Sequence, residues 1–274
     1  MSATESASQT APFLRAALRL IGWSGLGLIA VAVALSDFLA HFPAGVGGVG
    51  PMLAAPSALH AFGTDLLGRD VLSETLHGLS VTVVRAFLGA LVAIAVGGLF
   101  GAVAARLPRV MGLTLRGAMG VLAAIPALLL AILAIGLSAR LYAPLAAGLA
   151  AAPLAFVRAH DRVDALSRST HAEYARATGI SASTLLRRDL TYEFRDTLAT
   201  VAARALAAVT IILSTVSFLG FGATPPACDL GLMIAAARAN YLHAWWTAAF
   251  PALALVVLIL CARLAADLDE GERP

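Results

Sequence analysis

Long apolar runs separated by short polar segments dominate the pattern of this chain of 274 residues. A helix that crosses a membrane needs about 20 predominantly apolar residues, and the runs approach or exceed that length. The pattern therefore predicts an all-α membrane protein with six transmembrane helices, at Leu20–Leu35, Val81–Ala105, Ala118–Ser138, Leu141–Val157, Leu198–Phe221 and Ala244–Ala262.

The composition also indicates a surface that faces lipid. Hydrophobic residues make up 60% of the chain and charged residues only 13%, whereas soluble domains carry about 25% charged residues. So few charges cannot cover a surface of this size in water, and much of that surface must therefore lie in a membrane.

The arginines indicate how the chain is oriented. Six spans place both termini on one side, and cytoplasmic loops carry an excess of basic residues. With both termini in the cytoplasm, fourteen of the nineteen basic residues lie inside, Arg204 lies within the fifth run, and four lie outside or at outer span ends: Arg69, Arg85, Arg140 and Arg238. We therefore expect cytoplasmic N- and C-termini. The basic residues form no stripe with interleaved aromatics, so we expect contact with membrane lipids and none with nucleic acid.

The polar segments define the expected organisation. Residues 1–14 are rich in Ser, Thr and Ala and are expected to form a disordered cytoplasmic N-terminus without a secretory cleavage pattern. Residues 15–274 are expected to form one transmembrane permease-like domain, with a long outer segment at 37–80 and a cytoplasmic loop at 158–196. That loop has a helical, partly apolar pattern interrupted at Gly179. Because an exposed apolar patch is costly in water, the loop either docks on a partner protein or lies at the lipid headgroups.

No catalytic pattern emerges from the residues. The chain has no nucleotide-binding glycine loop with lysine, no His-x-x-x-His pair and no G-x-S-x-G. His60 and His77 flank part of the outer segment, either as metal contacts or, more commonly for loop histidines, as solvated side chains. Cys228 and Cys261 lack metal-ligand spacing and are interpreted as small apolar residues. We therefore expect no metal site and no directly bound cofactor.

Three features of the spans invite interpretation. Pro126 interrupts the hydrogen-bond ladder of the third run, as a kink that moves with a gate or as a static kink. Arg204 in the fifth run either faces a pathway or extends toward the headgroups. Glycines in the second run give it a small-residue face suited to close helix packing: Gly97, Gly98 and Gly101.

Four motifs resemble, in the right order, a known family of transport proteins. The stretch Phe62–Ser73 is similar to the signature G-T-D-x-x-G-R-D-V-x-S, and Ser217–Gly222 with Pro225–Pro226 is similar to S-F-L-G-x-G-x-x-P-P. Ala124–Pro126 matches an A-I-P in the third span, and Glu173–Gly179 resembles the loop E-A-A-x-x-x-G. Together they resemble the second permease of the dipeptide/oligopeptide/nickel family of ABC importers.

The chain also departs from that family's pattern. Tyr174 replaces an alanine of the loop motif, Thr191-Tyr192 stands where the family has L-P, and Leu230-Gly231 stands where it has W-G. These differences indicate a divergent member. We therefore do not carry a particular solute over from the family.

The resemblance implies a type I ABC importer permease in a bacterial inner membrane. Its partners would be a second permease in a heterodimer, two cytoplasmic ATPase subunits that bind the ATP, and a periplasmic or lipid-anchored solute-binding protein. The chain itself would be non-catalytic. The solute would be a peptide or a nickel or other metal chelate, moved by alternating access.

The resemblance also assigns roles to residues. The ATPase-docking loop would comprise Glu173, Tyr174, Ala175 and Gly179, with Arg187 and Arg188 either pairing with ATPase acids or anchoring the chain at the membrane. The outer signature segment would comprise Gly63, Thr64, Asp65, Gly68, Arg69 and Asp70. Its charged members either order the segment through local ion pairs or touch the solute.

Two rival functions belong to other classes. A stand-alone secondary transporter or channel should show paired charges buried in the membrane or a broken-helix repeat. Apart from Arg204, we expect the six runs to lack buried charge. An intramembrane enzyme should show a nucleophile with its base, or a metal site, inside the spans, and the runs show neither.

Overall fold

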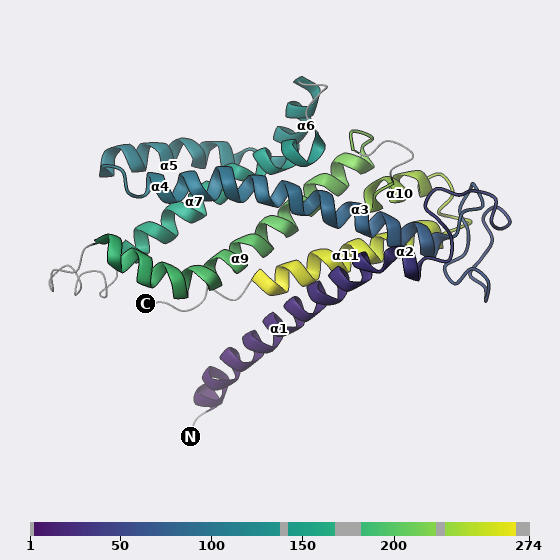
Figure 1. Ribbon diagram of the computed structural model, residues 1–274, viewed down its shortest axis with the longest axis horizontal. Helices are drawn as coiled ribbons and strands as arrows, with labels where there is room; N and C mark the ends of the chain where they lie inside the picture. Colours follow the sequence, from purple (N-terminus) through teal and green to yellow (C-terminus); the bar gives the residue numbers. More distant parts are fainter. Residues whose placement is uncertain (1–2, 138–141, 168–181, 223–227, 267–274) are drawn as a thin grey trace. The chain divides into compact units, whose positions relative to one another are not determined.

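The computed structural model describes residues 3–137, 142–167, 182–222 and 228–266, and their regular structure is helical apart from one isolated bridge between Thr64 and Asp70 (Figure 1). This agrees with the all-α prediction. The elements are α1 (Ala3–Ala34), α2 (Ser36–Leu39), α3 (Val71–Val92), the π-helix η1 (Ala93–Gly98), α4 (Leu99–Ala104), α5 (Arg109–Ala124), α6 (Ala127–Leu137), α7 (Ala143–Ser167), α9 (Ala182–Phe218), α10 (Leu230–Ala237) and α11 (Trp246–Ala266).

Within these ranges, four helical stretches are long and apolar enough to cross a membrane, at Ala16–Ala34, Val71–Ala104, Ala199–Phe218 and Trp246–Ala266. The bent pair α5–α6 makes a fifth if it counts as one span. The chain is thus a multi-pass membrane protein. The run predicted at Leu141–Val157 lies on α7, which is not among these candidates, so a sixth span stays a prediction.

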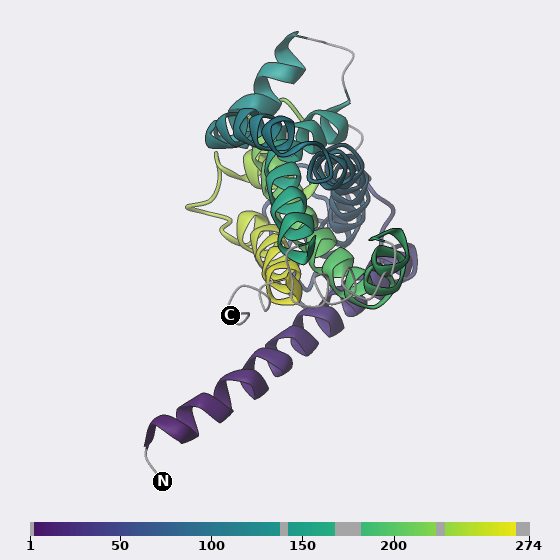
Figure 2. The same cartoon turned by 90° about the vertical axis from the view of Figure 1, so that its left-hand side faces the viewer.

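The chain divides into two compact units, one formed by residues 1–87 and 210–274 and the other by residues 88–209. In the first unit, α1 packs along α11, and its first turns extend past the end of α11 (Figure 2). An apolar cluster joins α1, α3, α10 and α11 through Ile29, Leu79, Leu230 and Leu258. Helix α1 begins at Ala3, so it includes residues that we expected to be disordered. Once a helix is nucleated, each added residue costs little, and this N-terminus is rich in alanine.

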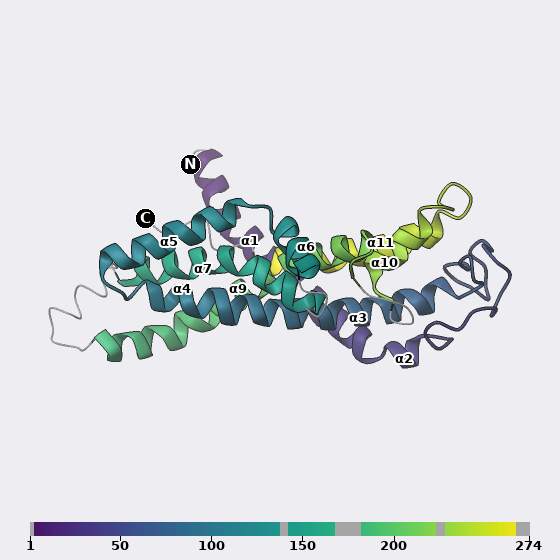
Figure 3. The same cartoon turned by 90° about the horizontal axis from the view of Figure 1, so that it is seen from above.

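In the second unit, α7 packs against η1, α4, α5 and α6 (Figure 3). Gly97 and Gly101 are buried, and a Cβ atom on either would overlap a backbone carbonyl oxygen of α7, that of Ala152 or Phe156. By contrast, a Cβ on Gly98 would meet only Ile94 of its own helix, at 3.7 Å. The small-residue face therefore consists of Gly97 and Gly101, and Gly98 does not belong to it.

The helix of the third predicted span breaks at Pro126. Helices α5 and α6 meet there at 87°, and Figure 1 shows α6 turned away from α5. Ile125 has the extended conformation (φ −74°, ψ 131°) that a following proline favours. The break is much sharper than a kinked continuous span, and whether it moves with a gate stays a prediction.

Candidate functional site

The signature segment, residues 62–73, is held together by its own polar side chains. Thr64 is fully buried; its hydroxyl donates to the carbonyl oxygen of Pro51 and accepts from the Ala54 N–H at 2.8 Å. The carboxylate of Asp65 accepts from the backbone N–H groups of Leu67 (2.8 Å) and Arg69 (2.9 Å). This irregular backbone is therefore satisfied internally, as burial requires.

Asp70 joins the signature segment to the first turn of α3. Its Oδ2 accepts from the backbone N–H (2.9 Å) and the hydroxyl (2.8 Å) of Ser73, which is the geometry of a helix N-cap. Its Oδ1 lies 3.0 Å from Nδ1 of His60. Residue 70 therefore explains why α3 begins at Val71, ten residues before the start that we predicted from hydropathy.

Arg69 lies between two carboxylates. Its Nε is 2.6 Å from Oδ2 of Asp65 and its Nη1 is 3.4 Å from Oε2 of Glu74, whose Oε1 accepts from the Gly45 N–H at 2.6 Å. Burial alone would lower the pKa of Arg69, but the two carboxylates outweigh it and the net pKa is raised. Local ion pairs are thus present in the segment, with Glu74 as a member that the motif did not predict.

Two glycines allow the segment to fold so tightly. Gly63 and Gly68 have φ of +74° and +66°, in the left-handed region that other residues rarely adopt. A Cβ on Gly63 would lie 2.6 Å from the carbonyl oxygen of Ala54, and one on Gly68 would lie 2.5 Å from that of Gly50. Both the conformation and the space therefore require glycine.

The segment is also fixed to the start of α11. Trp246 donates from Nε1 to the carbonyl oxygen of Thr64 at 3.1 Å, and Phe62 stacks on Phe250 with ring centroids 3.9 Å apart. Val71 and Leu53 complete this apolar contact. The segment is thus a rigid surface rather than a loose loop.

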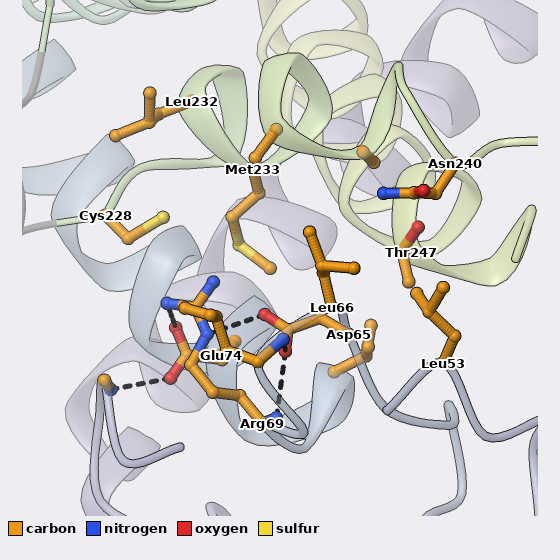
Figure 4. Close-up of a pocket in the computed structure, with 15 residues that line it drawn as sticks. Leu53, Asp65, Leu66, Arg69, Glu74, Cys228, Leu232, Met233, Asn240 and Thr247 are labelled. Atoms are coloured by element: carbon orange, nitrogen blue, oxygen red, sulfur yellow. Dashed lines mark hydrogen bonds and ion pairs between the residues drawn. The ribbon is translucent and has the colours of Figure 1, made fainter. Parts of the chain in front are cut away.

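A cavity of about 700 Å³ opens between the signature segment and α10; we call it the Arg69 pocket (Figure 4). Figure 4 shows Asp65, Arg69 and Glu74 together at one end, with Leu66 and Met233 above them. The lining residues are Gly45, Leu53, Asp65, Leu66, Leu67, Arg69, Val71, Glu74, Cys228, Leu232, Met233, Ala236, Ala237, Asn240 and Thr247. Its volume lies in the range of small-molecule sites.

Cys228 at the edge of this pocket is a neutral thiol. Burial, assisted by the charge of Glu74, raises its pKa to about 11. Because the thiolate is the nucleophile and metal ligand, Cys228 should react slowly at neutral pH. Throughout the described ranges, no cluster of three or more His, Cys, Asp or Glu side chains is arranged to hold a metal ion.

The interpretation of His60 as a solvated loop residue was wrong. Its side chain is only 9% exposed and hydrogen-bonds to Asp70, itself 4% exposed. Its partner Asp70 lies ten residues away along the chain, so no local sequence pattern predicted the contact. His77 is partly buried, with Nδ1 3.6 Å from the exposed carboxylate of Asp37.

The assumption that Arg204 was the sole buried charge of the spans was also wrong. Arg85, which we placed outside or at a span end, lies within the candidate span Val71–Ala104 and is buried. Its Nη1 is 2.6 Å from Oδ2 of Asp229, just before α10. The partners are 144 residues apart, so hydropathy could not reveal the pair. Asp229 itself lies between the motif positions Pro225–Pro226 and Leu230-Gly231, but no motif assigned it a role.

The remaining predicted residues are only partly described. The docking-loop positions Glu173, Tyr174, Ala175 and Gly179 lie outside the described residues. Arg187 and Arg188 lie on α9, and Arg204 is half-buried farther along the same helix. Their predicted roles stay predictions.

No protein-family model matches the chain. Curated relatives are nevertheless similar to it over most of its length. A peptide transport system permease protein of Brucella suis is 28% identical over 252 residues, covering 90% of this chain and 84% of the relative. A D,D-dipeptide transport system permease protein of Escherichia coli K12 is 29% identical, covering 78% and 73%. A glutathione transport system permease protein of Escherichia coli strain 536 is 30% identical, covering 77% and 71%.

Proposed function

The chain belongs to the dipeptide-type family of ABC transporter permeases, and we propose that it is the membrane-spanning subunit of an ATP-driven importer of peptide-class solutes. The observation that carries the proposal is the extent of the similarity. The alignment covers 90% of the chain, so it is long enough to include both the signature segment and the predicted docking loop.

The assembly that we propose contains this chain, a second permease, two cytoplasmic ATPases and a periplasmic or lipid-anchored binding protein. The chain would sit in the bacterial inner membrane with six spans, including α7, and with both termini in the cytoplasm. ATP binding by the ATPases would favour an outward-facing state and hydrolysis would reset it. The chain itself would hydrolyse no ATP.

Peptides are the solute class that the relatives favour. The relatives described above are named for peptides, D,D-dipeptides and glutathione. A nickel or metal-chelate solute remains the alternative from the sequence. The Arg69 pocket combines an apolar lining with paired charges, which suits the outer end of a pathway for small polar-apolar solutes.

The buried Arg85–Asp229 pair is a feature that a secondary transporter would also show. Sequence similarity to ABC permeases outweighs it, since a buried ion pair is equally compatible with a structural role. An uptake assay separates the two functions, because only the importer needs ATP and partner ATPases.

The proposal is tested by uptake of a radiolabelled dipeptide into cells that lack this chain and into the same cells complemented with it. We expect uptake to depend on the chain, to be abolished by ATP depletion and to be inhibited by unlabelled dipeptide or glutathione. Radioactive nickel is measured in parallel. Chain-dependent nickel uptake without dipeptide uptake would overturn the solute class, and uptake driven by a proton gradient alone would overturn the importer.

A further inference from the structure

Three helical segments that belong to the first unit, in α3, α9 and α10, meet at one buried carboxylate, that of Asp229. Its Oδ2 accepts from Nη1 of Arg85 on α3 and from the hydroxyl of Ser217 on α9, each at 2.6 Å. Its Oδ1 accepts from the backbone N–H of Leu232 at 2.9 Å and so caps α10. One side chain therefore fastens the first turn of α10 to α3 and α9 at once.

A second set of contacts reinforces this junction. The N–H of Leu230 donates to the hydroxyl of Thr82 at 3.1 Å, one helical turn before Arg85 on α3. Gly231 lies against the backbone of Ser214, where a Cβ would overlap the Ser214 carbonyl oxygen. The start of α10 is thus held by polar bonds on one side and by backbone contact on the other.

Stability alone does not explain this cluster. The side chains of Arg85 and Asp229 are only 10% and 6% exposed, and removing both charges from water costs about as much as their attraction returns. Apolar residues of similar size would often be equally stable. The ion pair adds a fixed arrangement of the helices, because the Asp229 carboxylate can accept all its hydrogen bonds only where donors from α3, α9 and α10 come together.

The same junction sets the shape of the Arg69 pocket. Helix α10 supplies one wall, including Leu232 and Met233, and the signature segment supplies the other. The signature segment is fixed to the first turn of α3 through Asp70, and α10 is fixed farther along α3 through Arg85. Both walls are therefore attached to one helix.

We propose that Asp229 is a positioning residue that holds α10 to α3 and α9, so that the two walls of the Arg69 pocket move as one body with these helices during transport. The part of this inference that concerns the transport cycle rests on the proposed function. The part that concerns the pocket wall does not.

The chain carries its own reporter for a test. It has two cysteines, so Cys261→Ala leaves Cys228, which lines the pocket directly before Asp229. The full chain in membranes is treated with N-ethylmaleimide, purified, and the rate of Cys228 modification is measured. We expect Asp229→Asn to raise the rate about tenfold, because the charged bond between α10 and Arg85 is lost and α10 opens locally.

Matched variants distinguish this junction from general damage. Arg116→Gln breaks an exposed ion pair between α5 and α7 and should leave the rate unchanged. The double variant Arg85→Gln/Asp229→Asn removes both charges of the pair, so its rate should lie between those of the parent and Asp229→Asn. If Asp229→Asn does not fold, the proposal is tested with the double variant and with Ser217→Ala. The Ser217→Ala variant should raise the rate about twofold. Equal rates in the parent and all folded variants, or a double variant that reacts as fast as Asp229→Asn, would overturn the proposal.

A second measurement tests whether the two walls of the Arg69 pocket move as one body. The complex purified with its ATPases is labelled without nucleotide and after trapping with ATP and vanadate. The Cys228 rates of the two states should differ more in Asp229→Asn than in the parent, because α10 then no longer moves with α3 and α9. A difference that is as large in the parent as in Asp229→Asn would overturn this part of the proposal. Failure to recover any ATPase would instead contradict the proposed function and leave the first experiment intact.

Discussion

The signature segment and the contact between α4 and α7 are both tightly packed, but they are held by different physical means. The signature segment is irregular backbone, and Thr64, Asp65 and Asp70 satisfy its donors and acceptors. The α4–α7 contact continues onto η1. It is a contact of helix on helix, and it is close because Gly101 of α4 and Gly97 of η1 present no side chain to α7. The signature segment depends on the hydrogen bonds of its polar side chains, and the helix contact depends on the small size of glycine.

This difference determines what a substitution should do in each region. In the signature segment a residue of the same shape but without the polar atom should fail, since a buried partner is then left unsatisfied. In the α4–α7 contact polarity is irrelevant, and any added atom should force two backbones apart. The following variants test that distinction, from the largest expected effect to the smallest.

Gly97→Ala should be the most damaging of the small changes. The new methyl group would overlap the carbonyl oxygen of Ala152, and overpacking of this kind costs about 3 kcal/mol. Unfolding of the purified chain in mild detergent measures the loss. Gly98→Ala is the matched control, because a Cβ there would make only ordinary contact with Ile94 at 3.7 Å, which predicts no loss. Equal damage from both variants would show that helix distortion, not contact with α7, is responsible.

Asp70→Ala should destabilise the first unit by about 2 kcal/mol, because α3 loses its N-cap and His60 loses its partner. The control is Asp37→Ala, whose side chain is 96% exposed and should change the free energy of unfolding by less than about 0.5 kcal/mol. Proteolysis of the 37–80 region reports the same loss locally. A stable Asp70→Ala chain with unchanged proteolysis would contradict the polar account of this region.

Thr64→Val keeps the shape of the side chain and removes its hydroxyl. The Ala54 N–H and the Pro51 carbonyl oxygen both lose a partner, so we expect a loss of about 1 kcal/mol or more. Thr64→Ser retains the hydroxyl and should recover most of the loss. If serine is worse than valine, packing of the methyl group matters more than the hydrogen bonds.

Arg116→Gln should have the smallest effect, since the Arg116–Asp161 pair is exposed and such pairs contribute less than about 1 kcal/mol. Hydrogen bonds from Arg116 are the main reason that the pKa of Asp161 is lowered from its ordinary value of 3.8. The folded state therefore gains stability above that value and loses it as the pH falls through the lowered pKa. The difference between parent and variant should be measurable at pH 7 and vanish at strongly acidic pH; a difference that grows on acidification would contradict this.

Much of the fold was predictable because apolar runs report directly on burial in lipid. The predicted runs in the first, second, fifth and sixth positions all coincide with helices that can span a membrane. Boundaries were less predictable where polar chemistry decides them. Helix α3 begins at its Asp70 cap rather than at the first apolar run, and Pro126 turns the chain by 87° instead of bending it slightly.

The candidate site was predictable only where a motif named its residues. The glycines, Thr64 and the charged residues of the signature segment were identified from the sequence, whereas Glu74 and the opposing α10 wall were not. The Arg85–Asp229 pair joins positions 144 residues apart. Pairing over such a distance depends on the folded chain and leaves no periodicity in the sequence.

We propose that this chain couples to ATPases through the predicted docking loop. Affinity co-purification of the full chain in mild detergent, with Glu173→Arg as the variant and Arg116→Gln as the control, tests it most directly. We expect parent and control to recover an ATPase and Glu173→Arg to lose it while remaining in the membrane. An ATPase bound equally well by Glu173→Arg would contradict the docking role of the loop, and a parent that recovers no ATPase would contradict the importer.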